Sequence, residues 1–273
     1  MLQLYWGQKM LPKLYINGFS CLKGDAKPED FAPFVDVRKL RRAEQISKNV
    51  LLCTYRALQQ AQLPVQAVHE MGLSLGIGAG ALGSTLKFIN SILEDGDELS
   101  SPTAFASSVH NSTALMLSMF LQIHGPCVIT GQFDASFAGT LLTAQQFLAK
   151  KMCSNVLIAV TEDVNPLVQE ELAKDATIFE PYVYQPTKPA QRLSAAYVVS
   201  DAPTTQTRFV LRDIHLSCSS DKSAKTPPQL EVCSCAHSAL LLANALEKKE
   251  PVSFREQFAG TILELKVEPY VFS

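Results

Sequence analysis

The sequence has no excess of charge of either sign, because 24 Lys and Arg residues stand against 26 Asp and Glu residues, for a formal net charge of −2. Only 18% of the residues are charged, whereas 47% are hydrophobic. Nucleic-acid-binding proteins usually carry a basic excess, and disordered chains combine low hydrophobicity with a large net charge. The composition therefore argues against both classes and predicts a soluble globular protein without a nucleic-acid partner.

Long hydrophobic runs are also missing. The longest strongly apolar stretch, Ala114 to Ile123, is roughly half of what a membrane span needs, so we expect no transmembrane helix. The apolar N-terminal residues 1–6 lack the charged start and the small-residue cleavage site of a secretory signal. The seven cysteines form an odd, scattered set, which is typical of a reduced, cytoplasmic protein.

The sequence lacks the second ligand pair that a structural zinc site requires. Cys233-x-Cys235-x-His237 lacks the spacing of zinc ligand pairs, and the spacing rule for zinc ligands predicts no metal site there. The same residues leave open a thiol acyltransferase with Cys233 or Cys235 beside His237, although no activating environment is visible. We expect neither a metal nor a resident cofactor.

Predicted strands and helices alternate along the chain, which favours an α/β fold. Leu14–Gly18 is predicted as a strand closed by a turn at Asn17-Gly18. The expected elements that follow are a helix at Ala43–Gln62, a buried strand at Met71–Ile77, a helix at Ser84–Leu93, a helix buried by the core or by a partner at Ser108–Ile123, a strand at Cys127–Thr130, a helix at Ala135–Lys150 and a buried strand at Val156–Val160. A thinner second half follows, with strands at Ala195–Val199, Phe209–Leu216 and Gly260–Val267 and a helix at Ser234–Leu246.

A glycine motif lies between the predicted strand at Met71–Ile77 and the helix after it. Gly78-Ala79-Gly80-Ala81-Leu82-Gly83 fits G-x-G-x-x-G, the fingerprint of dinucleotide-dependent oxidoreductases. However, the motif does not open the first strand-helix-strand unit, and the acids at 94–98 fall in a loop directly after the helix. We therefore favour a tight turn that needs positive φ, with the oxidoreductase as an alternative.

Ser101–Asn111 has the pattern Ser-Pro-x-x-Phe-x-x-Ser-Val-His-Asn, and Gly125-Pro126 follows at a fixed distance. With the strand Val156–Glu162, these segments resemble the N-terminal half of β-ketoacyl synthases of the thiolase superfamily. The pattern is most similar to short, divergent chain length factors of aryl polyene and type II polyketide pathways, which are related to fatty acid biosynthesis. The residues that carry the resemblance are His110, Asn111, Gly125 and Pro126.

The resemblance implies a thiolase-like layered α/β/α/β/α fold with a full first half and a shortened, degenerate second half. The expected organisation is a single domain over 1–273, with pseudo-halves at about 10–165 and 190–273 and a connector at 166–189.

The resemblance also implies a reactive cysteine nine residues after Gly125, and this position holds Asp134. A carboxylate cannot replace the thiolate that accepts an acyl group, whereas Asp is among the best helix N-caps. The His-Gly-Thr-Gly-Thr segment of the family is also missing, and only His237 could correspond to the other family histidine. We therefore expect no catalysis by the chain alone, but a role as a subunit of a β-ketoacyl synthase (acyltransferase) complex.

The implied partners are an active ketosynthase in a heterodimer and, transiently, an acyl carrier protein. The predicted strand Cys127, Val128, Ile129 and Thr130 would pair across the dimer axis. The basic segment Arg38–Arg42 fits either a solvated helix approach or a docking surface for the acidic carrier.

The implied acyl-tunnel candidates are Thr85, Leu86, Phe88, Ile89 and Met116. Each of them, taken singly, also fits an ordinary core position. His110 fits a hydrogen-bonded histidine in the core, since buried polar groups are normally paired.

Overall fold

The computed structural model describes residues 12–78, 80–96, 100–132, 135–163, 192–218, 235–249, 251–258 and 261–271. The predicted connector at 166–189 lies outside these residues, as does Asp134. None of the described helices has the length and hydropathy that crossing a bilayer requires.

One eight-stranded mixed sheet, in the order β3-β2-β4-β5-β1-β6-β8-β7, runs through the described chain. β2, β3 and β4 are parallel, and every other neighbouring pair is antiparallel. The strands are β1 (Leu14–Lys23), β2 (Gly72–Ile77), β3 (Cys127–Thr130), β4 (Asn155–Glu162), β5 (Leu193–Ser200), β6 (Phe209–Cys218), β7 (Val252–Phe258) and β8 (Thr261–Pro269).

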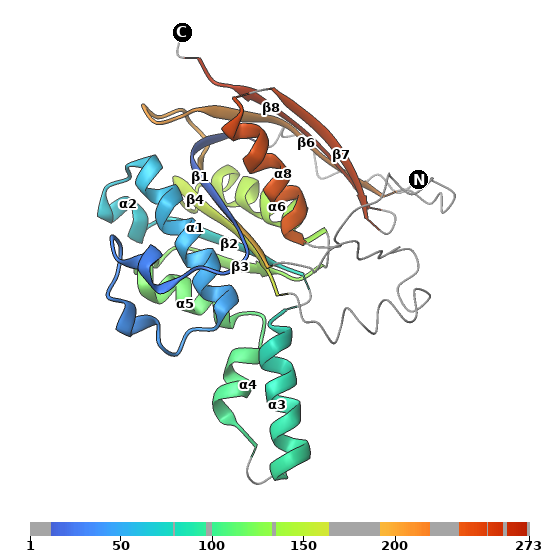
Figure 1. Cartoon of the computed structure of the whole chain (residues 1–273). Helices are drawn as coiled ribbons and strands as arrows, with labels where there is room; N and C mark the ends of the chain where they lie inside the picture. The colour runs from blue at the N-terminus through green and yellow to red at the C-terminus, as the bar shows by residue number, and fades with distance from the viewer. Residues whose placement is uncertain are drawn as a thin grey trace.

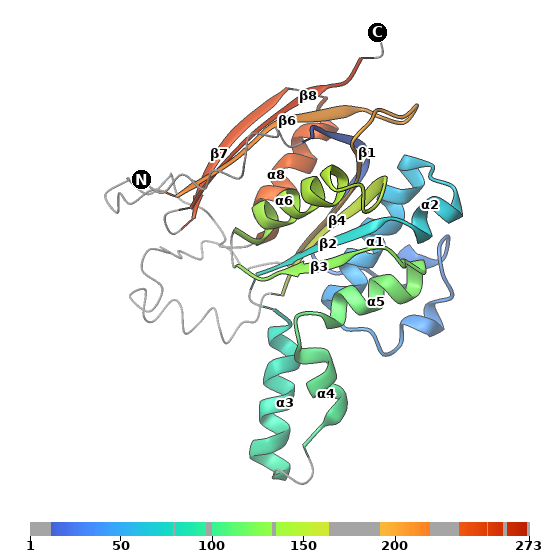
Figure 2. The same cartoon turned by 180° about the vertical axis from the view of Figure 1, so that it is seen from behind.

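The helices lie on both faces of this sheet. They are the 3-10 helices η1 (Pro28–Phe31) and η2 (Val37–Leu40) and the α-helices α1 (Gln45–Ala61), α2 (Val65–His69), α3 (Leu82–Asp95), α4 (Pro102–Ser108), α5 (Ser112–Leu121), α6 (Ser136–Ala149) and α8 (Cys235–Glu247). α1 and α5 pack on one face of the central strands, and α6 and α8 pack on the other. Figures 1 and 2 show β6, β8 and β7 passing over the far side of α6 and α8, which gives the layered α/β arrangement expected from the sequence.

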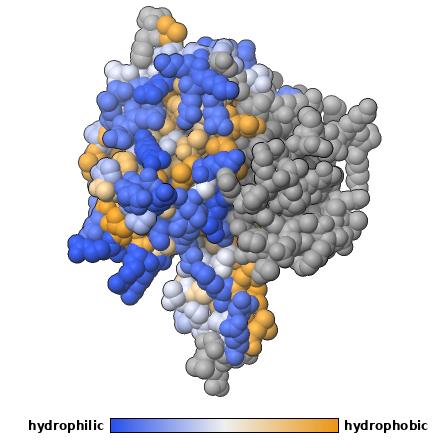
Figure 3. Space-filling model, viewed as in Figure 1, coloured by the Kyte–Doolittle hydropathy of each residue, from blue (hydrophilic) through white to orange (hydrophobic). Residues whose placement is uncertain are grey.

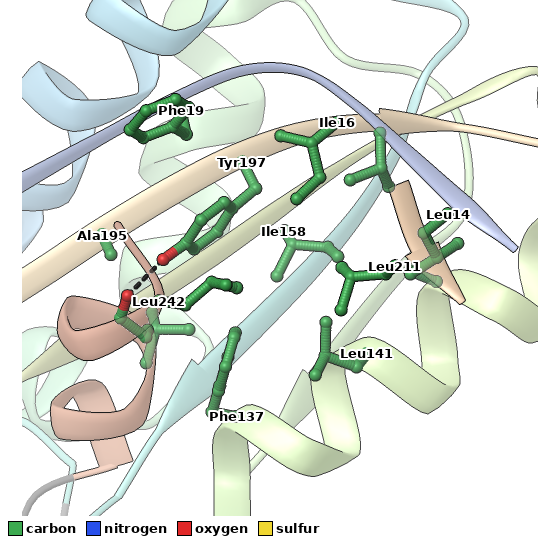
Figure 4. Close-up of a cluster of buried hydrophobic side chains, with 14 of the residues drawn as sticks. Leu14, Ile16, Phe19, Phe137, Leu141, Ile158, Ala195, Tyr197, Leu211 and Leu242 are labelled. Carbon is green, nitrogen blue, oxygen red and sulfur yellow. Dashed lines mark hydrogen bonds between the residues drawn. The ribbon is translucent and has the colours of Figure 1, made fainter. Parts of the chain in front are cut away.

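Side chains alternate along β4 between two hydrophobic clusters. Ile158 points into a cluster shared by α6, α8, β1, β5, β6 and β8, whereas its neighbours Leu157 and Ala159 point into a cluster with α1 and α5. Figure 4 shows the first cluster, in which the Tyr197 hydroxyl donates a hydrogen bond to the carbonyl of Ala239 on α8. Because both faces of β4 are buried, its sequence is a nearly continuous run of apolar residues.

The turn predicted at Asn17-Gly18 is wrong, because β1 continues to Lys23 with an irregularity in its register at this point. The Asn17 side chain is fully buried and bonds Ser200 of β5 (Nδ2 to Oγ, 2.9 Å). A Cβ on Gly18 would lie 2.1 Å from the carbonyl oxygen of Ala57, so the glycine lets α1 lie against the strand. Tertiary packing therefore overrides the local turn preference of this pair.

The remaining predicted elements are confirmed with shifts of a few residues, apart from the long helix at Ser108–Ile123. This segment is divided between the end of α4 and α5, and α5 buries only one face against the core. β7 and α4 were not predicted; β7 lies in a polar segment, and α4 is only a short helix.

Candidate functional site

The carboxyl ends of the parallel strands β2, β3 and β4 meet at one edge of the sheet. The glycine turn and α3 follow β2, α6 follows β3, and Asp163 follows β4. In open α/β sheets this edge is where ligands usually bind, so we take it as the candidate site.

The amino end of α3 is held by a carboxylate from another strand. Its N-cap residue, Ala81, offers no side-chain cap, and the N–H of Gly83 donates instead to Oδ2 of Asp163 over 2.8 Å. A Cβ on Gly83 would lie 3.1 Å from the same oxygen, so the glycine makes room for this contact. The glycine motif thus surrounds an internal carboxylate where a dinucleotide enzyme would hold a pyrophosphate, which argues against the oxidoreductase alternative.

Asp163 is only 7% exposed and is neutralised by Arg192 at the start of β5. Nε of Arg192 donates to Oδ1 of Asp163 over 2.8 Å, and Nη1 donates to both carboxylate oxygens of Asp25 over 3.1 and 3.0 Å. Burial lowers the pKa of Arg192, but the hydrogen bonds and charges of Asp163 and Asp25 outweigh it and raise that pKa above its ordinary value. The sequence reasoning missed these residues, although an acid directly after a buried strand, here Asp163 after β4, is a visible signal.

His110 lies between the turns that follow β2 and β3. A Cβ on Gly80 would lie 3.0 Å from Cε1 of its ring, and one on Gly131 would lie 3.3 Å from its Cδ2. Gly80 also has φ +84°, so the positive φ expected in the glycine turn occurs there. The His110 side chain is exposed, and its interpretation as a core histidine is therefore wrong. Asn111 is the N-cap position of α5, without a side-chain cap bond of its own.

The start of α6 is fixed to the end of β2. The Ser136 side chain is fully buried, accepts a hydrogen bond from the N–H of Gln132 (2.8 Å) and donates to the carbonyl of Ile77 (3.3 Å). Gly125-Pro126 forms the approach to β3 at the opposite end: a Cβ on Gly125 would lie 2.2 Å from the Met71 carbonyl oxygen. The Pro126 carbonyl accepts from the N–H of Leu73 over 2.8 Å.

β3 is an edge strand of the sheet, with exposed apolar side chains nearby. Cys127 and Val128 are exposed, and Ile129 and Thr130 are half-buried. On α5, Leu115 and Met119 are 62% and 69% exposed. The two lie four residues apart and so share one side of the helix. Among the described residues, no strand pairs with the outer edge of β3, and Leu115 and Met119 form an exposed apolar side of α5.

α3 and α4 form a helical arm that projects from the rest of the molecule (Figure 1). Phe88 of α3 stacks at a tilt on Phe105 of α4, with ring centroids 5.2 Å apart. The tunnel candidates on α3 are not core residues, because Thr85, Leu86 and Phe88 are only half-buried and Ile89 is exposed. Met116 of α5 is also half-buried and packs against the cluster beneath α1 and α5. Figure 3 shows hydrophobic residues along one side of the arm.

The possible thiol site cannot be built from the described side chains. Cys233 lies outside the described residues, and so do the side chains of Cys235 and His237. Within the ranges that the structure describes, no three His, Cys, Asp or Glu side chains come together as metal ligands.

Several solved structures that are similar to this chain are described as ketosynthases or ketosynthase complexes. A structure described as a type II PKS acyl-carrier protein in complex with its ketosynthase bound to the hexaketide (AntDE:AntF) has a TM-score of 0.74 at 12% identity, covering 94% of this chain and 99% of that chain. The ishigamide ketosynthase/chain length factor gives 0.70 at 11% identity, covering 94% and 99%. The ketosynthase ApeO in complex with its chain length factor ApeC from Xenorhabdus doucetiae gives 0.64 at 15%, covering 93% and 99%.

These similarities identify the fold as the thiolase-like α/β fold of ketosynthases. A sequence profile described as β-ketoacyl synthase, N-terminal domain, matches residues 23–257. The chain therefore belongs to the β-ketoacyl synthase family. No curated protein matches it by sequence.

Proposed function

We propose that this chain is a non-catalytic, chain-length-factor-like subunit of a ketosynthase heterodimer that acts in type II polyketide or aryl polyene-like biosynthesis. In this role it stabilises an active ketosynthase and shapes the end of the tunnel that holds the growing acyl chain. It forms one domain with two pseudo-halves, in the reducing environment of the cytoplasm.

The proposal rests on Asp134, which lies nine residues after Gly125, where the family resemblance implies a cysteine, in a chain that belongs to the family. Acyl transfer from a carrier protein needs a thiolate, and a carboxylate at pH 7 is a poor acceptor from a thioester. The retained scaffold without this thiol fits a subunit whose function is to assemble with an active one.

The uncovered apolar surface supports a partner chain. Among the described strands, β3 lies at one edge of the sheet, and proteins normally cover or protect such an edge. Exposed apolar side chains also lie on α5 and on the arm, where Leu93 is 76% and Phe105 54% exposed. Exposed apolar surface of this kind fits an interaction site, and the occupant that we commit to is the active ketosynthase. Two of the similar structures are described as ketosynthases with their chain length factors.

The arm provides the tunnel candidates. Thr85, Leu86, Phe88 and Ile89 lie on α3, and none of them is needed to fill the core of this chain. Their apolar side chains are therefore free to contact the acyl chain at the heterodimer interface, together with Met116. The exposed basic side chains of Lys39, Arg41 and Arg42 form the docking surface for the acidic carrier. The buried side chain of Leu40 holds this segment against the body.

Coexpression with the ketosynthase encoded beside this gene tests the heterodimer. Size-exclusion chromatography is expected to show one complex, which extends a carrier-bound acyl chain, while the isolated chain forms no product. Leu115→Glu should weaken the complex at least about tenfold, because it places a charge on the proposed interface. Val271→Glu is the matched control, since Val271 is 81% exposed at the end of the chain farthest from the arm (Figure 1). The proposal would be contradicted if the chain stays monomeric in the presence of the coexpressed ketosynthase, or if the isolated chain forms product.

A second experiment tests the tunnel residues in the same complex. Phe88→Ala and Met116→Ala remove bulk at the proposed tunnel end and are expected to shift the products towards longer chains. Mass spectrometry of the released products measures the distribution. Unchanged product lengths in both variants would remove these two residues from the tunnel.

A further inference from the structure

The α3–α4 arm is joined to the rest of the molecule by few contacts at its base. Ala81 packs against Ile46 and Ile77 in a small apolar cluster. Lys87 forms an exposed ion pair with Glu44 over 3.6 Å, which contributes little because water screens it. On the α4 side, the hydroxyl of Ser112 at the start of α5 donates to the carbonyl of Ser107 over 3.2 Å. On the α3 side, the N–H of Gly83 donates a hydrogen bond to Asp163.

The Asp163 contact combines burial with charge, which none of the other contacts named above does. Asp163 is buried, it accepts both the α3 amide and Arg192, and its position at the end of β4 is fixed by the central sheet. A carboxylate at a helix N-terminus is stabilised by the unpaired amides and by the helix dipole. α3 has no acidic residue in its own first turn and no capping side chain, so Asp163 supplies both effects from outside the helix.

We propose that Asp163 is a positioning residue that sets the direction of the α3–α4 arm, and that Arg192 holds Asp163 in the required orientation. α3 has 14 residues and is thus about 20 Å long, so a tilt of about 10° at its base moves its tip by about 3.5 Å. This displacement is comparable to the length of a two-carbon extension unit. Asp163 therefore contributes to the choice of product length without touching the acyl chain; this part rests on the proposed function.

The geometry also assigns a purpose to the third glycine of the motif. Among the described residues outside α3 itself, Asp163 supplies the one atom, Oδ2, that a Cβ on Gly83 would meet within 4 Å. A side chain at this position would displace the carboxylate from the helix amide. The G-x-G-x-x-G spacing is thus explained by an internal anchor, with Gly80 admitting the positive φ and the His110 ring.

Hydrogen exchange of the isolated full chain tests the anchor without a partner. Asp163→Ala and Asp163→Asn are expected to accelerate exchange of the first-turn amides of α3 about fivefold, as the loss of a helix cap does. Asp163→Glu, which keeps the charge, should restore part of the protection. The matched control is Asp30→Asn: Asp30 also accepts a backbone N–H, that of Lys27, and pairs with an arginine, Arg56, but it lies at η1 away from the arm. Unchanged exchange of the α3 amides in both Asp163→Ala and Asp163→Asn would overturn the proposal.

The product distribution of the heterodimer tests the consequence for specificity. Asp163→Asn is expected to reduce the share of the main product at least about twofold and to spread the lengths on both sides, with the total turnover less affected. A purely structural role would lower the total yield and the melting temperature while leaving the distribution unchanged. Faster exchange with an unchanged distribution would therefore reject the effect on product length. If the wild-type chain binds no ketosynthase, the proposed function fails, and the exchange experiment alone decides whether Asp163 holds the arm.

Discussion

The body and the arm of this molecule differ in where their apolar side chains go. The body, which comprises the eight-stranded sheet with α1, α5, α6 and α8, buries two continuous hydrophobic clusters on the two faces of its central strands. The arm, formed by α3 and α4, has apolar side chains of the same kinds but leaves Ile89, Leu93 and Phe105 exposed. The body thus obtains its stability from its own burial, whereas the arm has apolar surface suited to another chain.

This difference indicates how the chain divides its hydrophobic content. Besides the two buried clusters, exposed apolar side chains lie on the arm, on the outer side of α5 and on β3. α5 shows both kinds of surface within one helix: Leu117 is buried in the body, whereas Leu115 and Met119 are exposed to solvent.

The same substitution in the two regions should give the largest contrast. Phe137→Ala opens a cavity between α6 and the sheet and is expected to lower the free energy of unfolding by about 4 kcal/mol. Phe88→Ala removes a half-buried ring whose visible aromatic partner is Phe105, and it should cost about 1 kcal/mol. Urea unfolding followed by circular dichroism measures both. Equal losses would mean that the arm is part of the main core, which would remove the contrast.

Added methyl groups should give a smaller contrast of the same sign. Gly125→Ala places a Cβ 2.2 Å from the Met71 carbonyl oxygen, at the approach to β3, and is expected to cost about 3 kcal/mol because rigid backbone must move. Gly96→Ala at the end of α3 meets no atom within 4 Å, so only its φ of +80° opposes the change, at about 1.5 kcal/mol. The melting temperatures of the two variants, compared with wild type, check the order. A Gly96 variant less stable than the Gly125 variant would reverse the expected pattern.

Most of the body could be predicted from the sequence, because its elements carry their own signals. β2, β4 and α1 are bounded by turn residues and have the apolar patterns of a buried strand and an amphipathic helix. The arm was harder to predict. The apolar residues of α3 and α5 look like core residues in the sequence, since hydrophobicity does not tell whether the cover comes from the same chain or from another.

The anchor of the arm shows a second limit of sequence reasoning. The G-x-G-x-x-G motif pointed correctly to a turn that admits positive φ, but the sequence did not predict that a carboxylate of the same chain binds at the helix N-terminus. The anion is Asp163, 80 residues away, and neither this contact nor the pairing with Arg192 follows from local spacing. The turn predicted at Asn17-Gly18 was wrong for the same reason: contacts with α1 and Ser200, which are far away in the sequence, determine the conformation of this pair.

Alkaline pH should distinguish the two regions through a buried thiol. Cys53 of α1 is fully buried in the body, and this burial raises the pKa of its thiol well above the ordinary value of 9.0. In the arm, by contrast, the described charged side chains Lys87 and Glu94 are exposed. Below pH 9 the thiol keeps its proton in both states, and stability does not change on its account. Above pH 9 the unfolded chain loses this proton and the folded chain does not, so the free energy of unfolding falls as the pH rises.

The size of this effect follows from the pKa of the unfolded thiol, 9.0, and from the much higher pKa of the folded one. At pH 10 ionisation of the unfolded Cys53 thiol lowers the free energy of unfolding by about 1.4 kcal/mol relative to neutral pH. Urea unfolding of wild type and Cys53→Ala at pH 7.5 and pH 10 isolates this contribution, because the variant lacks the thiol in both states. The wild type should lose about 1.4 kcal/mol more than the variant between the two pH values. Equal losses would show that the Cys53 thiol ionises as readily in the folded body as in the unfolded chain, and that α1 is not sealed against the sheet.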